Sequence, residues 1–139
     1  MKPSAFIVTN VLLLSSLLTL SCRPKQAEGP IVVSARDLLS EYLAAPPDKV
    51  KQLRYNNRKL RVSGVLARVK SSEGLLILRG KEDATILNGV HCQLGGPDLN
   101  FNEVLEKLSQ VGEGDQIVVE GHNRGFEFGF VELVPCIIK

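Results

Sequence analysis

The sequence is poor in aromatic side chains and has only a small excess of basic over acidic ones. Its 139 residues include no tryptophan, one methionine and two tyrosines, and the formal net charge at pH 7 is only +2. Proteins that bind nucleic acid through a uniform electrostatic surface are usually clearly basic. The total charge gives that class no support, so any binding surface must come from a local arrangement of side chains.

Signatures of the common enzyme classes are also missing. The sequence has no G-x-S-x-G motif, no phosphate-binding loop, no H-E-x-x-H motif and no motif of paired carboxylates. His91 and Cys92 are consecutive, so on a strand they would point to opposite faces, and His122 stands alone. We therefore expect a protein that is not an enzyme and that holds no metal and no cofactor.

The first 21 residues have the layout of a secretory signal peptide. Lys2 precedes an uncharged apolar run over residues 5–20, which is too short to cross a bilayer. The segment Leu18-Thr19-Leu20-Ser21-Cys22 resembles the lipobox of bacterial lipoproteins, whose cysteine receives a diacylglyceryl group and an acyl chain such as palmitate. We expect cleavage before Cys22 and lipidation of Cys22. An ordinary signal peptide followed by an incidental cysteine is the alternative.

The lipobox resemblance implies a place in the bacterial cell envelope. Residues 22–33 contain two prolines and a glycine without helical periodicity, so they predict a lipidated tether ahead of a domain over residues 34–139. Arg23, rather than aspartate, follows Cys22. This resembles lipoproteins that are directed to the outer membrane and face the periplasm.

Two short helical patterns open the domain. Ser34 and Asp37 form a start resembling a capping box, and apolar residues recur with helical spacing between Leu38 and Leu43. Pro46-Pro47 stops this helix, because proline lacks the backbone N–H and restricts the residue before it. A second short helix is predicted to follow and to end near Asn56-Asn57.

From Lys59 onward the periodicity changes to that of β-strands. The predicted strands cover residues 59–69, 75–78, 89–94, 116–121 and 128–138. A helix capped by Asn102 is predicted between the third and fourth strands. In the first strand the apolar positions change parity at Ser63-Gly64, which predicts a β-bulge that bends the strand and turns Val65, Ala67 and Val69 inward.

Three strands, a helix and two strands, with a bent first strand, make the layout of the OB-fold barrel. The predicted fold is mainly β, a five-stranded OB-fold with a helix between strands three and four and an N-terminal helical segment. In that topology strands three and five are neighbours, which places Cys92 and Cys136 on adjacent strands. Because export provides an oxidising compartment and the two cysteines are an even pair, we expect a disulfide.

Five short segments of the domain form an ordered set that can be compared with a known family. They are Ser63-Gly64-Val65, Val90-His91-Cys92, Gly112-x-Gly114-Asp115, Val119-Glu120-Gly121 and Leu133-x-x-Cys136. Over about residues 34–139, this ordered set resembles the tRNA-anti-like family of small exported bacterial OB-fold domains. The resemblance implies a short OB-fold module, often behind a lipobox, and no established activity.

Charge is distributed unevenly along the domain. Residues 49–81 hold ten lysines and arginines against one acid, Glu73, whereas acids dominate residues 82–139. If the two halves interleave in one fold, many of these charges will pair across strands. The alternative is a basic face formed by Arg61, Arg68 and Lys70, which would bind a polyanion.

Phe126, Phe128 and Phe130 alternate near the last predicted strand, so they would share one face. Phenylalanines at this spacing usually line a barrel interior, and we predict that Phe128 and Phe130 do so. Phe126 lies where the loop between the last two strands begins, a region that OB-folds use for ligands. It therefore stays open as a ligand-binding residue.

Together the patterns predict a membrane-anchored lipoprotein with an OB-fold binding or interaction module. Its expected partners are the lipid bilayer, through acylated Cys22, and either an envelope protein or a polyanionic ligand. One alternative is an exported oligonucleotide- or oligosaccharide-binding protein. Another is a structural envelope component that binds a protein through the N-terminal helical segment.

The lipid anchor can be tested directly at Cys22. Replacing Cys22 with alanine should leave an uncleaved or soluble product, because the acyl chains that hold the protein on the membrane cannot be attached. Mass spectrometry of the mature protein and membrane fractionation check this. Identical mass and fractionation in Cys22→Ala and in the natural chain would rule the lipobox out.

Overall fold

The structure is a computed structural model that describes residues 29–80 and 88–139. The predicted signal peptide, Cys22 and most of the predicted tether lie outside the described residues. Within the two described ranges, no helix is long and apolar enough to cross a membrane.

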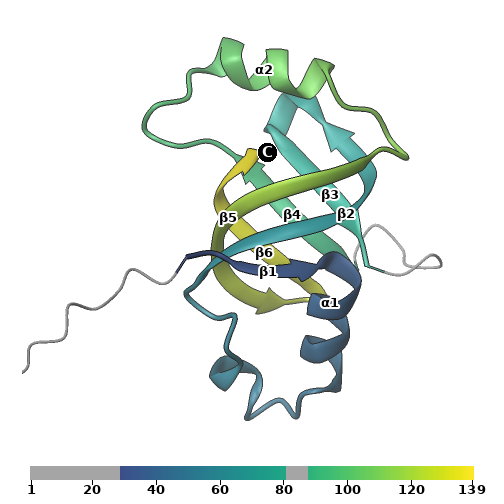
Figure 1. The fold of residues 1–139 in the computed structure, drawn as a ribbon, viewed down its shortest axis with the longest axis vertical. Coiled ribbons are helices and arrows are strands. Elements are labelled where there is room, and N and C mark those ends of the chain that lie inside the picture. Colours follow the sequence, from purple (N-terminus) through teal and green to yellow (C-terminus); the bar gives the residue numbers. More distant parts are fainter. Residues whose placement is uncertain (1–28, 81–87) are drawn as a thin grey trace, which may run out of the picture.

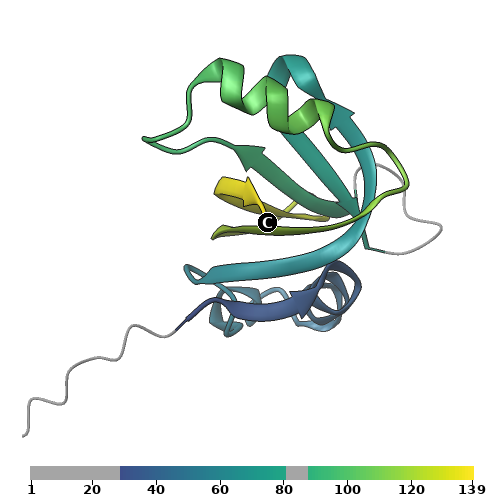
Figure 2. The same cartoon turned by 45° about the horizontal axis from the view of Figure 1, so that its top comes forward.

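Six strands form one sheet that closes into a barrel (Figures 1 and 2). The strands are β1 (Ile31–Ser34), β2 (Lys59–Lys70), β3 (Leu75–Arg79), β4 (Gly89–Leu94), β5 (Gln116–Glu127) and β6 (Phe130–Ile138). Their order is β1-β2-β3-β4-β6-β5, and β5 pairs back with β2. Strands β2 to β6 therefore make a closed five-stranded barrel, with helix α2 (Phe101–Ser109) between β4 and β5. This topology confirms the predicted OB-fold.

Strand β2 pairs with two neighbours in turn. Residues 59–65 pair with β5, and residues 65–70 pair with β3. The predicted position of the bulge was wrong, because the register shift lies between Leu66 and Arg68 rather than at Ser63-Gly64. Leu66 consequently fills the core, and Val65 lies on the outer face with Arg61.

Gly64 has a packing role instead. A Cβ atom at this position would lie 2.9 Å from the Cβ atom of Ala35, at the start of helix α1 (Ala35–Ala44). The glycine therefore lets α1 approach the barrel closely.

The domain begins earlier than the sequence predicted. Residues 31–33 were expected in the tether, but they belong to β1, which pairs in parallel with the first half of β2. Ile31 aligns with Leu60, and Ser34 aligns with Ser63. Strand β1 uses the part of the β2 edge with which β3 does not pair.

The helix ends follow their side-chain caps. The backbone N–H of Asp37 donates to Oγ of Ser34 at 3.0 Å, which confirms the predicted start of α1. For α2 the predicted cap was wrong: Asn100, not Asn102, accepts the Glu103 N–H at 3.0 Å. Asn100 stands three residues before Glu103, the spacing that lets the two residues satisfy each other at a helix start.

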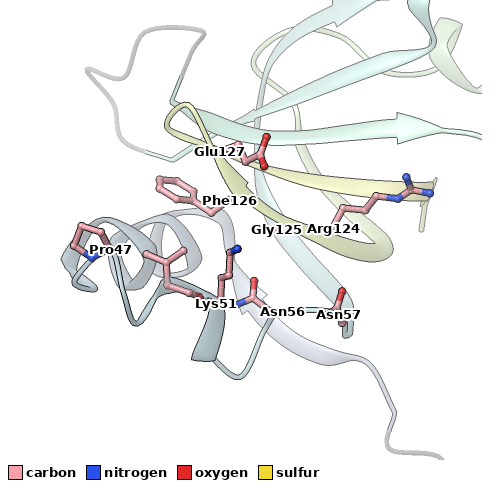
Figure 3. A pocket seen from close by; sticks show the side chains of 9 residues that line it. Pro47, Lys51, Asn56, Asn57, Arg124, Gly125, Phe126 and Glu127 are labelled. Atoms are coloured by element: carbon pink, nitrogen blue, oxygen red, sulfur yellow. Dashed lines mark hydrogen bonds between the residues drawn. The ribbon is translucent and has the colours of Figure 1, made fainter.

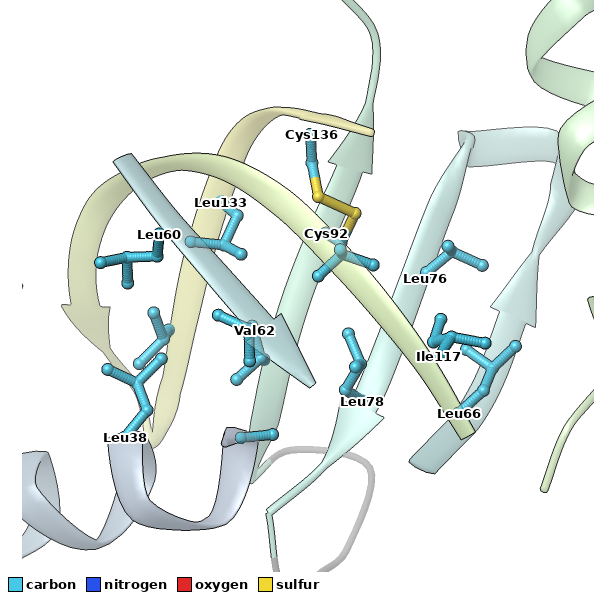
Figure 4. Packing of buried hydrophobic residues seen from close by; sticks show 14 of the residues in the cluster. Leu38, Leu60, Val62, Leu66, Leu76, Leu78, Cys92, Ile117, Leu133 and Cys136 are labelled. Atoms are coloured by element: carbon cyan, nitrogen blue, oxygen red, sulfur yellow. A yellow bond between two sulfur atoms is a disulfide. The ribbon is translucent and has the colours of Figure 1, made fainter. Parts of the chain in front are cut away.

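The apolar core fills the barrel and continues under α1 (Figure 4). Its fully buried side chains include Leu60, Val62, Leu76, Leu78 and Leu133. Cys92 and Cys136 lie in this core and form the predicted disulfide, with their Cα atoms 5.5 Å apart. The crosslink closes a sequence separation of 44 residues. By loop-closure entropy such a link contributes on the order of 4 kcal/mol to stability.

Candidate functional site

The segment between α1 and β2 folds across the end of the β5–β6 hairpin and leaves a groove there (Figure 3). We call residues 45–58 the connector; it contains the single 3₁₀ turn η1 (Val50–Gln52). The groove has a volume of about 450 Å³. It is lined by Pro47, Val50, Lys51, Asn56, Asn57, Arg124, Gly125, Phe126 and Glu127. We refer to it as the connector groove.

The backbone of Asn123 fixes the lower end of the connector to β5. Its N–H donates to the carbonyl of Arg58 at 2.9 Å, and its carbonyl accepts from the N–H of Asn57 at 3.2 Å. Asn123 has no exposed surface. The connector therefore ends in a short ladder with β5 before β2 begins.

The Asn123 side chain makes three further bonds. Its Nδ2 donates to the hydroxyl of Tyr42 and to the carbonyl of Tyr55, both at 2.8 Å. Its Oδ1 accepts from the N–H of Gly125 at 2.9 Å. A buried amide must find such partners, because leaving one unsatisfied costs about 1–3 kcal/mol. One residue thus joins α1, the connector and the β5–β6 hairpin.

Tyr42 connects Asn123 with two residues that line the groove. Its hydroxyl donates to Oδ1 of Asn56 at 2.7 Å, and its ring stacks on Phe126 with centroids 5.1 Å apart. Burial raises the pKa of Tyr42. The hydroxyl therefore keeps its proton and remains a donor at neutral pH.

Tyr55 holds the connector to α1 on the other side. Its hydroxyl donates to Oε1 of Glu41 at 2.6 Å and accepts from Nη2 of Arg54 at 2.8 Å. Burial, followed by the hydrogen bond to Glu41, raises the pKa of Tyr55. The two tyrosines together make the connector a fixed part of the domain.

The connector groove combines three kinds of contact. Lys51 and Arg124 supply exposed cations, and neither has an ion pair within the described parts of the chain. Asn57 supplies an exposed amide, whereas Asn56 is held by Tyr42 and by the Val50 carbonyl. Phe126 supplies a half-buried ring, so the groove can contact an apolar ring face, hydroxyl groups and a negative group at once.

The three phenylalanines do not share one environment. Phe126, which the sequence left open, lines the groove. The prediction that Phe128 and Phe130 lie in the core was wrong. Phe128 is 89% exposed, and Phe130 stacks on His91 with centroids 4.0 Å apart on the outer face. The reason is that β5 runs on to Glu127, so the chain turns at Phe128-Gly129 where a continuous strand was expected.

The predicted basic face is largely paired with acids. Arg61 donates from Nε and Nη2 to Oε2 of Glu120, at 2.9 and 2.8 Å, across β2 and β5. Lys70 lies 3.5 Å from Glu73, while Arg68 is exposed. The pair of Arg61 and Glu120 joins the two halves of the chain across strands, whereas Lys70 and Glu73 both belong to the basic segment 49–81. Lys70 and Arg68 lie beside β3, whereas Arg61 lies beside β5.

Glu120 is the centre of the largest described charge cluster. Its carboxylate is 4% exposed and also meets Lys59 at 2.7 Å and Lys139 at 3.9 Å. Hydrogen bonds from Lys59 and Arg61 lower the pKa of Glu120 from 4.5 to about 2. The carboxylate is therefore charged at every pH near neutrality, and its role is to pair cations.

Metal-ligand side chains do not converge in the described ranges, where no group of three or more His, Cys, Asp and Glu is placed to hold a metal ion. Cys92 is buried in the disulfide, and His91 lies on the opposite face of β4 against Phe130. His122 is exposed on β5.

Comparison with known proteins gives little beyond the fold. No family model matches the sequence, and no curated protein matches it. The telomere capping protein Ten1 from Saccharomyces pombe is a structural neighbour at 14% identity and a TM-score of 0.41, over 79% of this chain and 81% of that chain. The S. pombe Stn1-Ten1 complex gives 14% identity and a TM-score of 0.42, over 83% and 81% of the two chains. Similarity at this level says nothing about a ligand.

Asn123, the residue that organises the groove, was not predicted from the sequence. Asn123 follows Val119 and Gly121 at alternate positions of β5, so it has the parity of the core. A polar residue at core parity is a signal for a buried hydrogen-bond network. Lys51 and Asn57 carry no comparable signal, because their place in the groove depends on how the connector folds back.

The charge cluster generates a prediction about pH. Because the pKa of Glu120 is lower in the folded chain, its charged form stabilises the fold above about pH 4.5, and this contribution is lost as the pH falls toward 2. Glu120→Gln should lower the free energy of unfolding by about 1–2 kcal/mol at pH 7, since the paired cations are partly exposed. Denaturant titrations should show the two proteins converging between pH 4.5 and 2. Glu113→Gln, in an exposed turn, is the control, and a pH-independent difference for Glu120→Gln would contradict the prediction.

Proposed function

We propose that this chain is a lipid-anchored envelope protein whose OB-fold domain binds a short anionic oligosaccharide in the connector groove. The anchor rests on the Ser21-Cys22 junction after an uncharged apolar run. The disulfide supports export, because such links persist in oxidising compartments. Arg23 favours the outer membrane, with the domain in the periplasm. Membership of the tRNA-anti-like family stays a prediction from the sequence.

The observation that carries the proposal is the joining of Lys51 and Asn57 to Phe126 in one groove. These residues come from the connector and from β5, so only the folded chain brings them together. An anionic saccharide needs three kinds of contact. The ring of Phe126 can pack on a sugar face, the amide of Asn57 can bond to hydroxyl groups, and Lys51 can pair with a carboxylate or sulfate. The volume of about 450 Å³ lies within the usual range for ligand sites.

A saccharide fits the groove better than single-stranded nucleic acid does. Proteins that bind single strands place several aromatic rings under successive bases. The groove offers one ring, Phe126, whose face is partly covered by Tyr42. Phe130 lies instead against His91 on the outer face. The low net charge also gives no support to the extended basic surface that a long run of phosphates needs.

A titration followed by NMR tests the proposal on the chain lacking residues 1–28. A sulfated tetrasaccharide should shift the amide signals of Lys51, Asn57 and Phe126 and leave α2 unchanged. Phe126→Ala and Lys51→Gln should each weaken binding about tenfold, because one ring contact or one ion pair with a ligand is lost. Arg36→Gln, an exposed arginine on α1, is the charge-matched control.

Two outcomes would contradict this function. Shifts confined to Arg68 and the outer face of β3 would move the site to the basic face. Tighter binding of single-stranded DNA of equal charge than of the tetrasaccharide would replace the saccharide by nucleic acid.

A further inference from the structure

Phe128 occupies an unfavourable position for its side chain. It is the first of two residues in the turn between β5 and β6, and both residues have positive φ, 51° at Phe128 and 89° at Gly129. Hairpin turns of this kind favour Asn-Gly, because asparagine and glycine tolerate the left-handed region. A bulky phenylalanine there is strained, so the turn alone does not explain the residue.

The side chain also gains little from the fold. Phe128 is 89% exposed, the highest value among the large apolar side chains of the described residues. The other exposed large apolar side chains, Val32, Leu43, Phe101 and Leu105, belong to β1, α1 and α2. Phe128 is thus a single aromatic projection at a hairpin tip.

We propose that Phe128 inserts into the surface of the bilayer to which the chain is anchored. This inference rests on the proposed lipid anchor and adds a second contact with the same membrane. Glu127 and Phe130 pair across the hairpin, so the backbone is hydrogen-bonded up to the turn. Insertion therefore places an aromatic ring at the interface without burying a row of unpaired backbone groups.

Near the hairpin, two exposed cations lining the groove outnumber the one exposed acid that lines it, Glu127. Lys51 and Arg124 are exposed and line the groove together with Phe126 and Glu127. Basic side chains close to a bilayer are attracted to anionic headgroups by about 1 kcal/mol each. An aromatic tip with nearby cations has the composition of an interfacial contact.

The tether is long enough for this geometry. Eight residues separate Cys22 from Ile31, and the nine residue-to-residue steps between them span at most about 30 Å. Ile31 aligns with Leu60, which pairs with Gly121, and β5 runs from Gly121 to Glu127 over about 20 Å. The hairpin tip therefore lies within reach of the surface that holds Cys22.

The surface around Phe128 fits a protein partner less well than it fits a membrane. Specific protein interfaces bury roughly 1,000 Å² or more and include a contiguous apolar centre. The exposed apolar side chains described above come from separate elements. One projecting ring meets the demands of a lipid surface, which needs no complementary shape.

The absence of tryptophan makes the test direct, since one substitution introduces the only tryptophan of the chain. The full chain carrying Phe128→Trp is purified in its mature form and reconstituted in vesicles of phosphatidylethanolamine and phosphatidylglycerol that contain brominated lipids. We expect a blue-shifted emission and loss of at least half of the fluorescence to bromine quenching. Phe101→Trp, 63% exposed at the start of α2, is the matched control and should remain unquenched.

Acylation of Cys22 is measured separately, from the mass of the mature protein. If the protein is acylated and Trp at position 128 is not quenched, the insertion is overturned and the anchor stands. If the protein is not acylated, the anchor fails, and the same vesicles are added to the unanchored chain. Quenching at position 128 then supports membrane contact, and no quenching overturns it. Equal quenching at positions 101 and 128 also overturns it, because contact would not be specific to the tip.

A second variant separates insertion from stability. Phe128→Asn relieves the strained backbone, so it should raise the melting temperature while reducing vesicle binding of the unanchored chain severalfold. A variant that binds vesicles as the natural chain does would contradict the role of Phe128.

Discussion

The buried amide of Asn123 is the interaction on which the connector groove depends. Its backbone and side chain make five hydrogen bonds, to Asn57, Arg58, Tyr42, Tyr55 and Gly125. These partners belong to the connector, α1 and the β5–β6 hairpin. The barrel itself is held by apolar burial and the disulfide, whereas the connector contributes few residues to the core. Asn123 therefore decides whether the connector lies on β5 or leaves it.

The groove and the hairpin tip follow from this arrangement. Because Tyr42 is fixed by Asn123, its ring supports Phe126 as one wall, and Asn56 is held in the facing wall. The same hairpin continues to the exposed turn at Phe128. A ligand in the groove and a membrane at the tip would thus contact neighbouring parts of one rigid unit.

Sequence periodicity predicted the barrel because alternation and turns are local signals. Pro46 ended α1 as expected, and the OB-fold topology placed Cys92 beside Cys136. The groove could not be predicted in the same way, since it depends on a side-chain amide that bonds to a tyrosine hydroxyl and a backbone carbonyl far away in the sequence. A second limit of sequence prediction appears at Phe126, Phe128 and Phe130. Their alternate spacing fits one continuous strand, but it fits two strands joined by a turn equally well. The structure has the turn, at Phe128 and Gly129.

Amide hydrogen exchange in Asn123→Ala tests the central role of Asn123 most directly. The substitution removes the acceptor of the Gly125 N–H and both side-chain bonds to Tyr42 and Tyr55. We predict faster exchange at Gly125 and through residues 50–57, with protection retained in β3 and β4. Unchanged exchange in the connector, or an equal loss of protection across the whole barrel, would contradict it.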